Sequence, residues 1–206
     1  MTLFKSFFAL FIQFLKNVWG SIQSPYATYR KIVAEDPYQL IIIFTLIAGY
    51  FFLASPLKLH TLHPFLLTVN ASRLFTTVLC LYLGICFLLL GLSKLFNGVA
   101  SLRSVLMAWG YSLIPTLVWF LVTLVMYVLI PPPRTETILG RGFSLLYLTF
   151  SLSLFFWKGL LYYLTLRFAL KFDLTKIILA SLLFFPLLGA TSYFLYIFGI
   201  FKVPFI

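Results

Sequence analysis

The chain has 206 residues, of which 63% are hydrophobic and only 9% are charged, with a formal net charge of +11 at pH 7. A soluble domain carries about 25% charged residues, so this composition cannot cover a water-facing surface. The mean hydropathy of +1.09 leads to the same conclusion. The composition excludes a soluble globular domain and predicts an integral, multi-pass membrane protein.

Residues 1–36 are predicted to form an amphipathic segment that lies on the membrane surface before the first span. Wound as a helix, residues 3–19 place apolar side chains on one side and polar side chains on the other. The apolar set is Phe4, Phe7, Phe8, Phe11, Phe14, Leu15 and Val18, and the polar set is Lys5, Ser6, Gln13, Lys16 and Asn17. A cleaved signal peptide is the alternative, but Gln13 interrupts the apolar run and no small-x-small cleavage site follows.

Ser24-Pro25 predicts the start of a second short helix, and Asp36-Pro37 with Gln39 predicts a cap for the first span. Because a spanning helix needs about 20 apolar residues, residues 37–206 are predicted to form a domain of five transmembrane helices. These helices lie near residues 38–56, 73–95, 102–130, 143–166 and 174–200. A transmembrane β-barrel would need alternating polar and apolar residues, which these runs lack, so the predicted fold is all-α.

The Lys and Arg residues predict the orientation. With the N-terminus in the cytoplasm, nine of the 15 basic residues lie on the cytoplasmic side, five lie outside, and Lys158 lies within a span. This bias favours a cytoplasmic N-terminus and an outside C-terminus. The charges form no dense basic stripe, so anionic lipid headgroups are the expected partner and nucleic acid is not.

Lys158 is the one charged residue well inside a predicted span, which makes it a candidate functional residue. Ser144, Tyr147, Ser151, Tyr162 and Thr165 share its helical face. The side chain could snorkel to the cytoplasmic headgroups. It could instead be buried against an anion, a lipid phosphate or a carbonyl group.

The third predicted span contains a glycine and a proline with structural consequences. Pro115 predicts a kink and Gly110 a close approach of a neighbouring helix. Hydroxyl and aromatic residues recur along one face of this span: Ser112, Thr116, Trp119, Thr123 and Tyr127. This stripe could join helices to one another or could line a path for a solute.

The sequence also contains a weak internal repeat. Residues 102–108 and 174–180 are similar, and Pro115 and Pro186 follow them at comparable distances, as in a duplicated hairpin.

Other candidate sites have weaker support in the sequence. Cys80 and Cys86 fall on different helical faces and are expected to be buried thiols. His60 and His63 have no third ligand nearby, so no metal site is expected. Residues 131–136 (PPPRTE) predict a stiff turn, and residues 70–72 (NAS) are a formal glycosylation sequon that could equally cap the second span. No nucleophile and base occur at catalytic spacing, so neither enzyme activity nor a cofactor is expected.

Residues 92–115, LSKLFNGVASLRSVLMAWGYSLIP, resemble the Yip family of five-span membrane proteins. The resemblance depends on the turn Asn97-Gly98 and on the pattern Gly110-Tyr111-x-x-x-Pro115. Upstream, Trp19, Ser24-Pro25 and Arg30 are similar to the lead-in of prokaryotic members. The resemblance extends over about residues 19–200. The Asp-Leu-Tyr-Gly-Pro signature of the eukaryotic branch does not occur in this sequence, so direct binding of Rab GTPases is not implied.

The resemblance implies a multi-pass protein with a cytoplasmic N-terminus and an outside C-terminus, associated in eukaryotes with membrane trafficking. We therefore expect a non-enzymatic protein of a prokaryotic cytoplasmic membrane that organises the membrane or recruits a partner. A protein partner or a second copy of the chain could bind through helix faces. The alternative is a transporter of a small solute or lipid that uses the polar seam around Lys158. The candidate residues are Lys158, Ser151, Tyr162, Gly110, Tyr111, Pro115, Asn97, Gly98 and Pro186.

Overall fold

The structure, a computed structural model, describes residues 2–59, 64–129 and 138–199, and the regular secondary structure in these ranges is helical. The elements are α1 (Thr2–Gln23), α2 (Pro25–Ile32), α3 (Gln39–Leu59), α4 (Pro64–Leu95), α5 (Leu102–Ser112), α6 (Ile114–Leu129), α7 (Ile138–Leu164), the π-helical stretch η1 (Thr165–Ala169) and α8 (Leu174–Ile197). The predicted all-α fold is confirmed.

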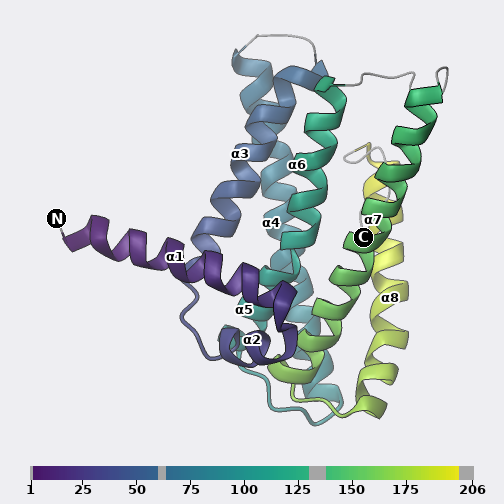
Figure 1. Cartoon of the computed structure of the whole chain (residues 1–206). Helices are drawn as coiled ribbons and strands as arrows, with labels where there is room; N and C mark the ends of the chain where they lie inside the picture. Colours follow the sequence, from purple (N-terminus) through teal and green to yellow (C-terminus); the bar gives the residue numbers. More distant parts are fainter. Residues whose placement is uncertain (1, 60–63, 130–137, 200–206) are drawn as a thin grey trace.

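The long helices run side by side as a bundle, and α1 runs crosswise to them below the lower end of α3, while α4, α7 and α8 extend past it (Figure 1). Within the described ranges, four helical stretches are long and apolar enough to cross a membrane: Phe65–Leu95, Leu102–Met126, Gly140–Ala169 and Leu174–Ile197. Gln39–Ala54 is a shorter apolar helix. The chain is therefore a polytopic membrane protein, and the fifth span, near residues 38–56, stays a prediction.

Helix α4 begins earlier than the sequence suggested. It starts at Pro64, where a helix tolerates proline because the first backbone N–H groups have no partner within the helix. Residues 70–72 therefore lie inside α4, and the expectation that they cap the second span is wrong. At the start of α2, Ser24 occupies the N-cap position, but its side chain makes no capping hydrogen bond.

The third predicted span is divided into α5 and α6 at Leu113, two residues before Pro115. Pro115 has no N–H to donate to the carbonyl of Tyr111, and the N–H of Leu113 bonds instead to Gly110 O at 3.1 Å. The expected interruption is confirmed. Pro186 behaves differently, because α8 continues through it from Leu174 to Ile197.

Asn97 and Gly98 close α4 at the end of the bundle where α2 lies. Asn97 adopts a φ of 51°, and the Gly98 N–H donates to Ser93 O at 2.7 Å, as in a Schellman C-cap. A Cβ on Gly98 would lie 2.6 Å from the Phe172 ring and 2.9 Å from Leu170 O. The predicted Asn97-Gly98 turn is therefore present, and only glycine fits its second position.

His60, His63 and residues 131–136 lie outside the described residues.

Candidate functional site: the α1 anchor and the α7 lysine

Helix α1 has one side buried in the protein and another side that exposes apolar residues. Phe14, Asn17 and Ser21 are buried against the rest of the protein. The opposite side exposes a row of large apolar residues, which we call the α1 apolar face: Phe8, Phe11, Ile12, Leu15, Trp19 and Ile22. The N-terminal half of α1 extends past α3 (Figure 1). The expectation that Asn17 lies on a solvated polar side is wrong, because its side chain is only 3% exposed.

Asn17 belongs to a buried polar cluster with Glu35, Gln39 and Tyr111, which we call the anchor cluster. Asn17 Nδ2 donates to Glu35 Oε2 at 2.6 Å, to Gln39 Oε1 at 3.1 Å and to the Tyr111 hydroxyl at 3.3 Å. The Gln39 amide donates to Glu35 Oε2 at 2.8 Å and accepts a short hydrogen bond from Tyr111. Three segments far apart in the sequence therefore meet in this cluster: α1 with Asn17, the link into the start of α3 with Glu35 and Gln39, and α5 with Tyr111.

The residues around Glu35 explain why the expected cap at Asp36 does not form. Gln39 is occupied within the anchor cluster, so the predicted box-like cap between Asp36 and Gln39 is wrong. Asp36 instead pairs with Arg103 at 2.7 Å. The Arg103 guanidinium also donates to Glu35 O and Ala34 O at 3.1 and 3.2 Å. Arg103 therefore ties the link between α2 and α3 to the start of α5.

Gly110 and Tyr111 have distinct roles on adjacent faces of α5. A Cβ built on Gly110 would overlap the Leu40 side chain, so α3 approaches α5 closely here, as the sequence predicted. Tyr111 is fully buried and contributes its hydroxyl to the anchor cluster, a role that the Gly-Tyr-x-x-x-Pro pattern did not reveal. The motif thus combines a packing notch, a polar contact and a helix break within six residues.

Tyr29 fixes α2 beneath α5. Its side chain is fully buried, and its hydroxyl donates to Ala108 O at 3.1 Å. Burial raises the pKa of Tyr29 well above its ordinary value of 10.0. The phenol therefore keeps its proton, and its hydrogen bond, at any physiological pH.

The polar stripes predicted on the third and fourth spans face one another as α6 and α7. Trp119 Nε1 donates to Ser151 Oγ at 3.0 Å, and the hydroxyls of Thr123 and Tyr147 are 2.8 Å apart. Lys158 Nζ donates to Thr116 Oγ1 at 2.9 Å. These three contacts join the helices side by side, as expected of interhelical polar contacts.

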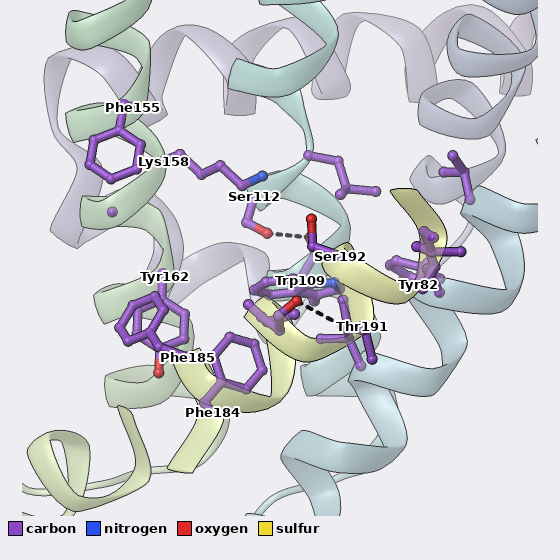
Figure 2. A pocket seen from close by; sticks show the side chains of 17 residues that line it. Tyr82, Trp109, Ser112, Phe155, Lys158, Tyr162, Phe184, Phe185, Thr191 and Ser192 are labelled. Carbon is purple, nitrogen blue, oxygen red and sulfur yellow. Dashed lines mark hydrogen bonds between the residues drawn. The ribbon is translucent and has the colours of Figure 1, made fainter. Parts of the chain in front are cut away.

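Lys158 points into the protein and lines a cavity between α4, α5, α7 and α8, where Figure 2 shows it reaching toward Ser112. The snorkelling alternative is not the arrangement seen here, because the amine is bonded to α6. Tyr162 lines the same cavity and bonds to Ser181 on α8 at 3.0 Å. Ser151 and Pro186 are not among the residues that line it.

The cavity also holds two polar residues that were not selected from the sequence. Trp109 and Ser192 are 5% and 3% exposed, and both line the cavity. Trp109 lies three residues before Ser112 and so continues the stripe predicted on the third span, a signal that could have found it, whereas no polar stripe was predicted on α8. Among the described residues, no group of three or more His, Cys, Asp or Glu could hold a metal ion. Cys86 is buried as expected, whereas the expectation that Cys80 is buried is wrong, because Cys80 is exposed.

Comparison with protein families shows that the model of the Yip1 domain matches residues 19–197. This range begins inside α1 and ends with the last residue of α8. It therefore includes three members of the anchor cluster, from Glu35 to Tyr111, together with Lys158. Comparisons with curated proteins and with solved structures found no match.

Proposed function

This chain belongs to the Yip1-domain family, and from this premise we propose that it is a non-enzymatic protein that organises the membrane by inserting α1 into one leaflet. The observation that carries the proposal is the position of α1. The helix runs crosswise to the spanning helices below the lower end of α3 (Figure 1), and its α1 apolar face is exposed. A helix placed this way adds area to one leaflet only.

The anchor cluster distinguishes α1 from a free amphipathic helix. A free helix partitions into the interface and rotates to suit the lipid. In this protein Asn17 and Phe14 hold one side of α1 against the bundle, so the α1 apolar face keeps a fixed direction. Bending of the lipid surface would therefore be transmitted to the spans, and the density of the protein in the membrane would set the curvature.

Charge supports placement of α1 in the cytoplasmic leaflet, with the C-terminus outside. Basic residues occur on α1 and α2, near the end of α4 and the start of α5, in and after η1 and near the start of α8, where they would meet anionic headgroups. This set includes Lys16, Arg30, Lys31, Lys94, Arg103, Arg167, Lys171 and Lys176. We take the membrane to be a prokaryotic cytoplasmic membrane. A recruited protein would meet the same surface, in keeping with the trafficking role of the family in eukaryotes.

The test is reconstitution of the full chain into liposomes of phosphatidylethanolamine and phosphatidylglycerol, followed by electron microscopy of liposome shape and diameter. We expect wild-type protein to give tubules or small vesicles at high protein density. The triple variant Ile12→Ala, Leu15→Ala, Ile22→Ala should leave the liposomes large and round, because it removes apolar area from the α1 apolar face without touching the anchor cluster.

A matched control removes similar apolar area from a spanning helix. Leu145, Leu146 and Leu148 are exposed on α7, and replacing all three with alanine should leave membrane remodelling intact. Equal remodelling by wild type and the α1 triple variant would contradict the proposal. A deletion of residues 1–24 is less informative, because it also removes Asn17 from the anchor cluster.

A second candidate is a transporter of a small solute or lipid, favoured by the inward position of Lys158. It predicts flux of a fluorescent lipid between leaflets in the same proteoliposomes, with a defect in Lys158→Met. The α1 triple variant should then transport at the wild-type rate. Absence of flux in wild-type proteoliposomes would exclude this candidate for the lipids tested.

A further inference from the structure

The cavity beside Lys158 is a small apolar chamber inside the bundle. Its volume is about 140 Å³, and side chains of α4, α5, α7 and α8 line it (Figure 2). A larger groove of about 790 Å³ lies between α4 and α8. Chamber and groove share five lining residues, Leu81, Ile85, Leu188, Thr191 and Leu195. The two spaces are therefore neighbours along the same pair of helices.

Two buried donors in this chamber have no hydrogen-bond partner among the described residues. They are Nε1 of Trp109 on α5 and Oγ of Ser192 on α8. Each side chain is more than nine-tenths buried, and each lines the chamber. Buried polar groups are nearly always bonded, because an unpaired one costs free energy. An indole N–H can only donate, so a ligand that satisfies Trp109 must bring an acceptor.

The charge of the chamber is positive. Lys158 lines it, while no acidic residue does. The acidic side chains in the described part of the chain lie outside the chamber: Glu35 accepts from Asn17, Asp36 pairs with Arg103, and Asp173 pairs with Arg167 at 3.4 Å. The acceptor that suits this chamber is therefore an anion.

The size and lining of the two spaces select the kind of anion. A dry cavity of about 150 Å³ holds one benzene-sized molecule, so a chamber of about 140 Å³ accepts a carboxylate with a few carbons. A phospholipid headgroup with its glycerol is too large. The rest of the lining is mostly apolar, and the adjoining groove runs along α4 and α8, where it can continue an alkyl chain.

We propose that this chamber binds the carboxylate of a long-chain fatty acid, with Lys158, Trp109 and Ser192 as its donors and the acyl chain in the groove between α4 and α8. The proposal does not depend on the role of α1. A fatty acid is a component of every lipid bilayer in small amounts, so it reaches the groove laterally through the membrane. Binding would satisfy both unpaired donors at once.

The experiment measures equilibrium binding of tritiated palmitate to the full chain in nanodiscs. We expect saturable binding of one palmitate per chain, about tenfold weaker in Trp109→Phe and at least tenfold weaker in Lys158→Met, since each loses one bond to a charged group. Lys94→Met is the matched control: Lys94 is an exposed lysine in the last turn of α4, and its loss should leave affinity unchanged.

Competition identifies the headgroup. Unlabelled palmitate should displace the label, whereas palmityl alcohol, which lacks the charge, should not. Tighter competition by lysophosphatidylglycerol than by palmitate would overturn the choice of a carboxylate. Wild-type affinity in both Trp109→Phe and Lys158→Met would overturn the site itself. If Lys158→Met fails to fold by size-exclusion chromatography, Ser192→Ala, which removes a single oxygen, decides the question by the same measurement.

Discussion

Asn17 on α1 donates a hydrogen bond of 2.6 Å to Glu35, the residue 18 positions later that precedes the first predicted span. The contact is charge-assisted, because the acceptor is a carboxylate, and such bonds are stronger than neutral ones. Its second oxygen lies 4.0 Å from Lys31. The surface helix and the bundle are thus joined by a partly buried, charge-assisted hydrogen bond, which makes α1 a fixed part of the fold.

Replacing Asn17 with leucine should destabilise the protein by about 1–3 kcal/mol, because Glu35 and Gln39 would lose a buried donor. The measurement is the free energy of unfolding of the purified full chain in detergent. Lys16→Leu, at the adjacent exposed position, is the control and should change stability by less than about 0.5 kcal/mol. Equal stability of the two variants would show that the anchor cluster does not hold α1.

Tyr111→Phe removes only the hydroxyl that connects α5 to Gln39. We expect a loss of about 1 kcal/mol. In combination with Asn17→Leu the losses should be less than additive, because both residues serve one network. The same unfolding measurement on the two single variants and the double variant tests this. Strict additivity would mean that the two residues act independently.

Gly110→Ala should destabilise the protein by about 1 kcal/mol, because the added methyl group overlaps the end of the Leu40 side chain, which must shift where α3 meets α5. Adding Leu40→Ala should restore part of the loss by opening space for the methyl group. Gly49→Ala is the matched control, since a Cβ at Gly49 meets nothing within 4 Å. A neutral Gly110→Ala would mean that the helices can separate without cost.

The bond between Trp119 and Ser151 should contribute little, although it lies between two membrane helices. Interhelical hydrogen bonds in membranes are worth about 0.6 kcal/mol on average. A double-mutant cycle with Trp119→Phe and Ser151→Ala should therefore give a coupling free energy of about 0.6 kcal/mol. A coupling above about 2 kcal/mol would show that this contact is a principal support of the bundle.

Prediction from the sequence succeeded where a structural feature is caused by residues within a few positions of it. Pro115 lacks an amide proton wherever it lies, so the division between α5 and α6 follows from sequence. Gly98 follows Asn97, whose backbone is in the left-handed region at the end of α4, and the pair Asn97-Gly98 predicts a turn. The same reasoning failed for Asn17 and Gln39, because their partners Glu35 and Tyr111 are brought to them by helices packed from elsewhere in the chain.

The sequence by itself determined that the chain is helical and embedded in a membrane, because apolar runs of about 20 residues can satisfy their backbone only as helices. It also singled out Lys158 as an unusual residue. Only the tertiary structure decided where these groups point. It turned Asn17 inward, gave Lys158 a partner on α6 and brought Trp109 and Ser192 to one chamber. Helical periodicity defines the faces of each helix, whereas packing alone selects which face meets which neighbour.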